Sequence, residues 1–380
     1  MKPWTIAVVA LSLLLAACSH WDDPKVARAK LAANAEGDIV IGAVWPWSGA
    51  KGGLWDGIEL AVEEINAKGG ILNRPLRIVK EDDESSLAKG RLIAQQFAET
   101  PEMVAVIGHL NSYIALPAST IYQSAGLVYL TPGAHSYSLN SQGYDLVFRS
   151  IPSNRSVGLQ MAEYMATQGY RRVAIYYIKD KSSQDMSNYF EQRVRELGLT
   201  VVDRRSYTQG TQDFSSTIQN WKDLYQFDAL FLAANMPEGG NFIAQARKMG
   251  LNVPIVGGGG LDTHKLMEVA GDAAEGVIVP EVVALDERWP NYRHFSENFT
   301  QKYGRPAHSN AVQGYDAVHL LTQAMRQANS SVPDKIAQAL HRTKEWAGAG
   351  GEFTFDEQGD IPNKKVGIKV VRGGKFETVR

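Results

Sequence analysis

The stretch Ile39–Gly70, IVIGAVWPWSGAKGGLWDGIELAVEEINAKGG, contains one strand pattern followed by one helix pattern. Residues 39–44 form a short apolar run, which is typical of a strand buried on both faces. After a loop rich in glycine and tryptophan, apolar residues recur at helical spacing until two glycines end the pattern. They are Leu54, Ile58, Ala61, Val62 and Ile65. A buried strand followed at once by an amphipathic helix predicts the first unit of an α/β fold.

Strand and helix patterns alternate along most of the remaining chain. We expect helices at 87–98, after Pro117 and between the later strands. The expected strands are 76–79, 103–107, 127–131, 172–178, 199–202, 229–232, 254–257 and 276–279. The tail from Gly351 has strand and turn character, with a strand at 366–371 and no helix after it. This alternation predicts the class α/β, with two doubly wound lobes built on parallel sheets.

The first 18 residues have the composition of an export signal. Lys2 precedes the apolar run Thr5–Leu15, which is too short to span a bilayer, and small residues precede Cys18. Cys18 is the only cysteine, so its thiol is the side chain that could take a thioether-linked lipid. We therefore expect residues 1–17 to be a lipoprotein signal peptide and Cys18 to be a membrane anchor outside the cytoplasm. The alternative is a plain secretory signal, or an N-terminal anchor with an incidental cysteine.

Residues 18–38 are polar and rich in alanine, which predicts a tether that is partly helical around 30–35. At full extension about 20 residues reach roughly 65 to 70 Å, enough to hold a domain clear of a membrane. Ser19, which follows the cysteine, is not the aspartate that favours inner-membrane retention in Gram-negative cells. The sequence is therefore compatible with anchoring in either the inner or the outer membrane.

Composition and motifs exclude several classes of function. The net charge of -2 and the ordinary charged content of 21% do not give the positive electrostatic potential that binding of nucleic acid requires. Without a second cysteine the chain has no internal disulfide or thiolate metal site, and its eight histidines lack ligand spacing. The GxxxxGK[ST], HExxH and GxSxG motifs are absent, and the glycine run 257–260 does not match a dinucleotide fingerprint. We expect a protein without catalysis, metal or cofactor.

In open α/β sheets, ligands bind beyond the carboxyl ends of the strands. Six loops follow predicted strands there, at 45–49, 109–113, 131–135, 180–184, 235–239 and 258–262. The tryptophans of the first loop either offer flat walls to a ligand or pack under the loop, and the polar groups of the second suit an anionic oxygen. His135 is either a ligand contact or a surface histidine. Glu238 suits a helix N-terminus better than a ligand site, and Arg155 either neutralises an anionic ligand or is structural.

From about Asp38 to about Val371, the chain resembles the type I periplasmic solute-binding proteins of ABC importers, the branch that includes the leucine/isoleucine/valine-binding proteins. The resemblance rests on the order and spacing of many short motifs. They are Gly57–Asn66 with Ala67–Ile71, Glu81–Asp83, Ile107–Leu110, Pro117–Ser119, Thr131–Pro132, Phe148–Arg149, Pro152–Ser153, Asp213–Phe214, Ala246–Arg247, Gly250–Leu251, Ala274–Gly276 and Gly314–Ala317.

The resemblance implies two lobes joined by a three-segment hinge, with crossovers near Ser150, Pro280 and Gly359. Lobe 1 would contain residues 39–150 and 281–358, and lobe 2 residues 151–280 and 359–380. The cleft between them would close on a small solute. The family also implies ABC permease subunits as partners, no cofactor, and a monomer.

The resemblance further implies a set of ligand-binding residues. They are Trp47, Trp55, Asn111, Ser112, Tyr113, Gly133, Ala134, His135, Ser182, Asn235, Gly259 and Asp262. In the family a serine like Ser112 holds the ligand α-carboxylate, and the loop matching 133–135 holds its ammonium. A carboxylate of lobe 2 completes the ammonium site, but here Gly259 takes that position and Asp262 is displaced from it. His135 replaces a contacting threonine, and Ser182 and Asn235 fall where the branched-chain binders have tyrosines.

These departures favour a solute other than a simple branched-chain amino acid, because a buried ammonium without its carboxylate costs several kcal/mol. We hypothesise an aromatic or other organic acid stacked on Trp47 or Trp55, with Ser112 and either Arg155 or His135 taking its charge. Rotation of Asp262 into the cleft would restore the amino-acid interpretation. The alternative function is a ligand-sensing or scaffold lipoprotein that regulates an envelope partner. An enzyme is the weakest hypothesis, because no nucleophile, base and orienting group gather in one set of loops.

Overall fold

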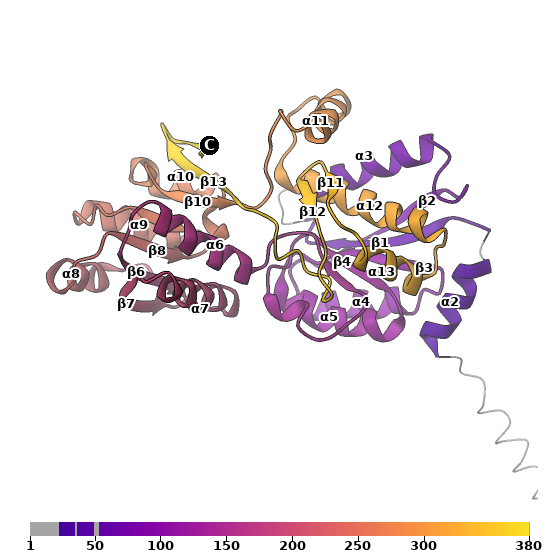
Figure 1. Cartoon of the computed structure of the whole chain (residues 1–380), viewed down its shortest axis with the longest axis horizontal. Helices are drawn as coiled ribbons and strands as arrows, with labels where there is room; N and C mark the ends of the chain where they lie inside the picture. Colours follow the sequence, from indigo (N-terminus) through magenta and orange to yellow (C-terminus); the bar gives the residue numbers. More distant parts are fainter. Residues whose placement is uncertain (1–22, 35, 49–52, 380) are drawn as a thin grey trace, which may run out of the picture.

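The computed structural model describes residues 23–34, 36–48 and 53–379. The chain forms two α/β lobes joined side by side, as Figure 1 shows. Each lobe is built on a sheet whose main strands are parallel, which confirms the predicted fold class. Among the described residues, no helix is long and apolar enough to cross a membrane.

The sheet of lobe 1 has five strands in the order β2-β1-β3-β4-β5, all paired in parallel. The strands are β1 (Ile39–Trp45), β2 (Leu76–Asp82), β3 (Met103–Gly108), β4 (Val128–Thr131) and β5 (Val147–Arg149). The helices of this lobe are α2 (Pro24–Asn34), α3 (Leu54–Ala67), α4 (Leu87–Ala98), α5 (Ser112–Ala125), α11 (Pro290–Tyr303), α12 (Ser309–Ala328) and α13 (Pro333–His341). The short elements η1 (Tyr137–Leu139), β11 (Trp346–Gly348) and β12 (Gly351–Phe353) complete it.

Helices cover both faces of the lobe 1 sheet, because side chains along a strand point alternately to its two sides. Ile39 and Ile41 of β1 pack in a core with α3, α12 and α13. Val40 and Val44 of the same strand pack in a second core with α4 and α5. The apolar run at the start of the quoted stretch is therefore continuous because both of its faces are buried.

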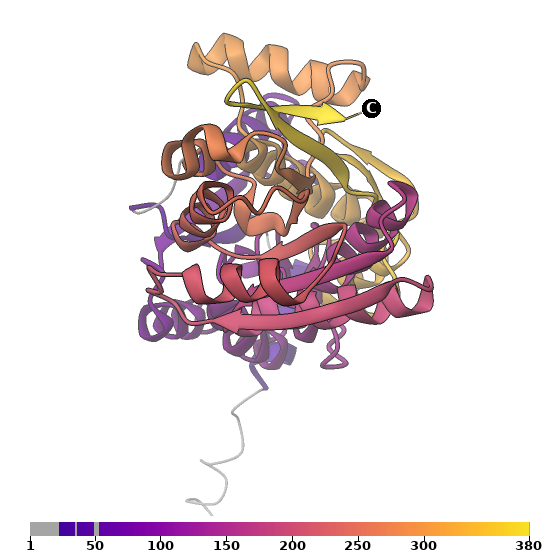
Figure 2. The same ribbon diagram turned by 90° about the vertical axis from the view of Figure 1, so that its left-hand side faces the viewer.

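The sheet of lobe 2 has seven strands in the order β14-β13-β10-β9-β8-β6-β7. They are β6 (Arg172–Ile178), β7 (Thr200–Tyr207), β8 (Ala229–Ala233), β9 (Ile255–Gly257), β10 (Ile278–Glu281), β13 (Gly367–Arg372) and β14 (Lys375–Val379). The helical elements are α6 (Asn154–Thr167), α7 (Lys181–Glu196), α8 (Ser215–Leu224), α9 (Glu238–Lys248), η2 (Gly259–Leu261), α10 (Lys265–Ala270) and η3 (Gly271–Ala274). Figure 2 looks onto this lobe, with the antiparallel C-terminal hairpin β13-β14 in yellow at the sheet edge.

The chain passes between the two lobes three times. It leaves lobe 1 between β5 and α6, returns between β10 and α11, and leaves again between β12 and β13. The last passage is fastened to lobe 1 by Arg149, whose guanidinium donates two bonds to the Asp360 carboxylate, at 2.5 and 3.1 Å. The hinge therefore consists of three neighbouring segments from distant parts of the sequence.

Several elements differ from the sequence predictions. The predicted helix 87–98 and strand 172–178 are confirmed. Helix α5, in contrast, begins at Ser112 and not after Pro117, which lies inside the helix. Strand β14 was not predicted, because its exposed edge position requires little apolar character. The largest difference is α2, which begins at Pro24, well before the predicted helical stretch, and packs against lobe 1 through the buried Arg28.

Candidate functional site

The N-terminus of α5 carries the groups best placed to bind an anion. The backbone amides of Ser112 and Tyr113 donate to no other described residue, and the N-cap Asn111 provides no side-chain cap. The Ser112 hydroxyl lies beside them and accepts a bond from the Ser136 amide, at 3.1 Å. Free amides at a helix N-terminus point toward the ligand, and the helix dipole adds positive potential.

A buried polar network supports the loop that leads into α5. The His109 imidazole bonds through Nδ1 to the Asp83 carboxylate at 2.7 Å and through Nε2 to the Tyr122 hydroxyl at 3.1 Å. The His109 amide, one of the N–H groups that the sequence suggested for a ligand, donates instead to the Tyr129 hydroxyl at 2.9 Å. His109 and Asp83 are both fully buried. The network therefore positions Ser112 and does not itself offer a contact.

Two predicted site residues, Asn111 and Tyr113, connect the same loop to the turn after β2 by hydrogen bonds. The Asn111 side chain donates to the Ser85 hydroxyl at 3.0 Å, and the Tyr113 hydroxyl donates to the Ser85 carbonyl at 2.6 Å. Ser85 lies in a tight turn after β2, with a positive φ of 56°. These contacts leave the Tyr113 ring 53% exposed.

The third loop of lobe 1 approaches the first one closely. A Cβ atom at Gly133 would lie 2.4 Å from Cη2 of Trp45, so only glycine fits there. The amides of Gly133 and Ala134 both donate to the Thr131 hydroxyl oxygen, at 3.2 and 3.0 Å. This loop is therefore rigid, and neither of these two amides is free for a ligand.

His135 is neutral at physiological pH. Its Nδ1 lies 3.0 Å from the Pro152 carbonyl, so that nitrogen carries the proton and donates it. Burial lowers the pKa of the His135 imidazole to about 4. No described residue bonds to Nε2, which remains as a hydrogen-bond acceptor. His135 therefore does not supply the positive charge that we hypothesised for it.

Asn154 connects the two lobes at the first passage of the chain. The backbone amide of Asn154 donates to the His135 carbonyl at 2.8 Å, and its side-chain amide donates to the Ser182 hydroxyl at 2.6 Å. Ser112, Ser136, His135, Asn154 and Ser182 therefore form one run of neighbouring groups across the lobes.

The run continues through lobe 2. Asp180 caps α7 by accepting from the Ser183 amide at 2.7 Å, and it also accepts from the Asn235 side chain at 3.0 Å. Asn235 in turn lies against Gly260, where a Cβ atom would come within 2.5 Å of its Oδ1. A Cβ atom at Gly259 would meet nothing within 4 Å. The position where the family resemblance expects a carboxylate is open space.

Asp262, the displaced carboxylate, already has a cation. Its Oδ2 lies 3.2 Å from Nζ of Lys369, and the same ammonium lies 3.4 Å from the buried Glu281 carboxylate. Burial raises the pKa of Glu281. Two carboxylates thus share one lysine, and a rotation of Asp262 toward Gly259 would break its ion pair.

Trp47 and Trp55 contact each other and a lysine. Their rings meet edge to face with centroids 5.9 Å apart, and the Trp47 indole N–H donates to the Glu81 carbonyl at 2.7 Å. Nζ of Lys80 lies 4.1 Å from the Trp55 ring centroid and 4.9 Å from that of Trp47. Both rings are thus engaged within lobe 1.

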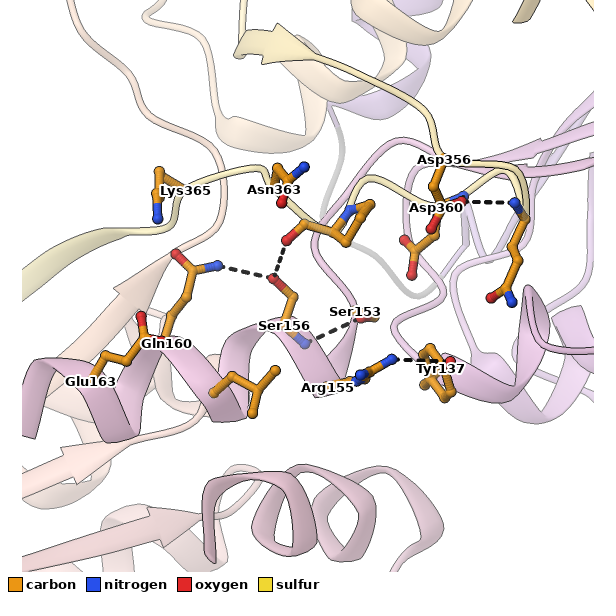
Figure 3. A pocket seen from close by; sticks show the side chains of 13 residues that line it. Tyr137, Ser153, Arg155, Ser156, Gln160, Glu163, Asp356, Asp360, Asn363 and Lys365 are labelled. Carbon is orange, nitrogen blue, oxygen red and sulfur yellow. Dashed lines mark hydrogen bonds between the residues drawn. The ribbon is translucent and has the colours of Figure 1, made fainter. Parts of the chain in front are cut away.

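A cavity of about 340 Å³ lies beside the hinge, and Figure 3 shows the side chains that line it. None of the twelve predicted ligand-binding residues borders it, but Arg155, the other candidate ligand cation, does. Arg155, which the sequence suggested as a ligand cation, points to the Tyr137 hydroxyl at 3.1 Å and stacks over the rings of Tyr137 and Tyr189. This arginine therefore connects η1 of lobe 1 to α7 of lobe 2, which sequence reasoning missed because the contact joins distant segments.

Within the described ranges, no three histidine or acidic side chains gather as metal ligands do. This arrangement can support hydrogen bonding and charge complementation of a small solute, with unpaired amides in lobe 1 and, opposite them, polar side chains of lobe 2 that include the Asp180 carboxylate.

Comparisons with known proteins show the family of the chain. A family model described as periplasmic binding protein matches residues 38–375. The Leu/Ile/Val-binding protein of Escherichia coli K12 is 29% identical over 336 residues, covering 87% of this chain and 90% of the relative.

Two solved structures with ligands are also similar. An ABC transporter substrate-binding protein from Desulfitobacterium hafniense, in complex with Leu, is 37% identical with a TM-score of 0.82, and the match covers 90% of this chain and all of that one. The LivJ protein of Streptococcus pneumoniae, in complex with isoleucine, is 25% identical with a TM-score of 0.76, covering 90% and 99%. The chain belongs to the Leu/Ile/Val-binding family of type I periplasmic binding proteins, the solute-binding proteins of ABC transporters.

Proposed function

We propose that this protein is a lipid-anchored receptor outside the cytoplasm that closes on a small organic carboxylate and delivers it to an ABC importer. The observation that carries the proposal is the uncapped N-terminus of α5, with the free amides of Ser112 and Tyr113 beside the Ser112 hydroxyl. Cys18, the proposed lipid attachment site, lies outside the described residues.

The carboxylate would be neutralised by backbone amides and the helix dipole, and by no side-chain cation. Of the two cations first considered, His135 is neutral because burial lowers its pKa to about 4, and Arg155 is engaged by two tyrosines. Leu and isoleucine, the ligands named for two structural relatives, both carry an α-carboxylate. Their presence supports a carboxylate as the shared feature of the solute.

Among the described residues, the other end of the solute would meet acceptors but no unengaged carboxylate, because Asp180 already accepts from the Ser183 amide and the Asn235 side chain. Gly259 has no side chain, Asp262 is paired with Lys369, and Nε2 of His135 accepts only as a neutral group. An ammonium held by neutral acceptors is bound less tightly than one held by a carboxylate. We therefore propose that the preferred solute is not a simple branched-chain amino acid. Because Trp47 and Trp55 already pack edge to face against each other and lie under the Lys80 ammonium, an aromatic solute is favoured less than other organic acids.

Transport would follow from the two-lobe arrangement. A solute that contacts both Ser112 and the Ser182–Asn235 region stabilises the closed state by its differential affinity for that state. The closed form would then dock on a permease.

A thermal-shift screen of the chain from Ser19 onward tests the proposal against amino acids, organic acids and their amides. A ligand present at 100 times its dissociation constant adds about 2.7 kcal/mol to the unfolding free energy. The proposal predicts a shift with carboxylates, a smaller shift in Ser112→Ala, which removes the hydroxyl but keeps the backbone amides, and an unchanged shift in Ser141→Ala, which removes an exposed hydroxyl elsewhere. Tight leucine binding without any response to other carboxylates would contradict the proposed solute class.

A further inference from the structure

Helix α2 is clamped to lobe 1 by one buried arginine. The Arg28 side chain is 2% exposed and donates to four main-chain carbonyls. They belong to Met103 (2.8 Å), Ala98 (2.7 Å), Thr100 (3.0 Å) and Ala125. A guanidinium has five donors in a rigid fork, so it can bind several carbonyls at once where a lysine could not.

Two more contacts hold α2 along its length. Nζ of Lys25 lies 3.1 Å from the Asp334 carboxylate at the start of α13. The Ser331 hydroxyl donates to the Ala32 carbonyl at 3.0 Å. The helix is therefore part of the folded lobe, although the sequence placed it in a free tether.

The clamp lies at the end of lobe 1 that is remote from the proposed solute site. Met103 begins β3, and Ala98 and Ala125 end α4 and α5. These are the amino-end edges of the parallel sheet, whereas Ser112 and His135 follow the carboxyl ends of β3 and β4. Figure 1 shows α2 on the far side of lobe 1 from lobe 2.

We infer that the Arg28 clamp holds the α2 edge of lobe 1 against the surface of a lipid bilayer, with the solute site on the opposite side of that lobe. The inference rests on the lipid attachment proposed at Cys18. Only residues 19–23 separate that cysteine from α2, and they reach about 20 Å at full extension. The arm is therefore less than a third of the roughly 65 to 70 Å that an undocked tether would reach.

Two apolar side chains at the opposite margins of the exposed side of α2 can contact a bilayer interface. Val26 is 44% exposed and Leu31 is 39% exposed, and both are large apolar side chains on a short helix. Apolar side chains of a helix that lies in the interface plane are buried among lipid headgroups and acyl chains. The partner of this edge is thus a lipid surface.

Energy transfer on liposomes tests the inference with the full lipidated chain. Because Cys18 is the only cysteine, Lys335→Cys beside the clamp and Leu224→Cys in lobe 2 each provide one free thiol for a donor dye when Cys18 carries the lipid. Acceptor-labelled lipid is placed in vesicles of phosphatidylcholine with phosphatidylglycerol. We expect several-fold stronger transfer from position 335 than from position 224. Equal transfer from both positions would overturn the inference.

Two variants separate the clamp from general stability. A flexible Gly-Ser segment of about 12 residues inserted before Pro24 leaves the clamp intact but lengthens the arm. The ratio of energy transfer from position 335 to that from position 224, called the contrast below, should therefore fall severalfold. Arg28→Met should reduce the contrast and open residues 24–34 to proteolysis, with Arg28→Lys intermediate. An unchanged contrast after the insertion would contradict the inference. If mass spectrometry of the intact protein shows no lipid on Cys18, the anchoring on which the inference rests is ruled out. Solute binding in the thermal-shift screen would be unaffected by that result.

Discussion

The two halves of the proposed solute site are built differently. In lobe 1, Ser112 and the α5 amides are held by a buried network of Asp83, His109 and Tyr122 and by a glycine that fits against Trp45. In lobe 2, the polar side chains bond mainly to one another, and the position of Gly259 is open space. We propose from this comparison that lobe 1 provides a rigid site for the group that all solutes share, and that lobe 2 determines which solute is preferred.

Removing the buried carboxylate of lobe 1 should have the largest effect. Asp83→Ala leaves Nδ1 of the His109 imidazole without its partner in a fully buried site, so the free energy of unfolding should fall by about 3–5 kcal/mol. Asp262→Ala in lobe 2 should cost less than about 1 kcal/mol, because Lys369 keeps Glu281 as a partner. Urea unfolding of both variants measures the difference. Similar losses in the two variants would refute the proposed difference in rigidity.

A pair of glycine substitutions compares the packing of the two halves. Gly133→Ala places a Cβ atom 2.4 Å from the Trp45 ring and should cost about 1–3 kcal/mol through overpacking. Gly259→Ala meets nothing within 4 Å and should leave the melting temperature nearly unchanged. Scanning calorimetry of both variants provides the test. A loss at position 259 as large as that at 133 would mean that the lobe 2 site is also closely packed.

Restoring a carboxylate in lobe 2 should change the solute preference. Gly259→Glu puts an acceptor where the family resemblance expects the ammonium partner, and the open space there can take the side chain. Leucine should bind at least about tenfold tighter than to the wild type, since a hydrogen bond to a charged group contributes about 1.5–3 kcal/mol. Binding of 4-methylpentanoate, which lacks the ammonium, should not improve in calorimetric titrations. An equal gain for both ligands would contradict this role of position 259.

The smallest effect should be a pH dependence that His135 contributes. Its pKa is about 4 in the folded protein and about 6.5 when unfolded, so the unfolded state binds more protons between these values. The stability should therefore be complete above pH 6.5 and decrease as the pH falls toward 4. We expect a loss of about 1–2 kcal/mol rather than the roughly 3 kcal/mol of the full pKa difference, because the His135 side chain is partly exposed to solvent. His135→Gln should lack this component in melting curves recorded across that range. A variant with the same slope as the wild type would show that other groups account for it.

Sequence patterns predicted the parts of the fold that depend on local burial. Helix 87–98 was predictable because its apolar residues recur at helical spacing, and strand 172–178 because it is a nearly continuous apolar run. The docking of α2 was not predictable, because Arg28 reads as an ordinary charged residue until the carbonyls of four distant residues surround it. For the same reason the sequence could indicate Ser112 as a site residue but not that His135 is neutral or that Lys369 already pairs with Asp262. Those properties depend on Pro152 and on β13, which lie far away in the sequence.

The most direct test of the account compares matched ligands that lack one charged group each. Leucine, leucinamide and 4-methylpentanoate differ only in the carboxylate or the ammonium, and calorimetric titration against the wild-type chain gives the contribution of each group. We predict that removing the carboxylate, which the α5 amides and Ser112 would bind, weakens binding much more than removing the ammonium. Stronger dependence on the ammonium than on the carboxylate would contradict it.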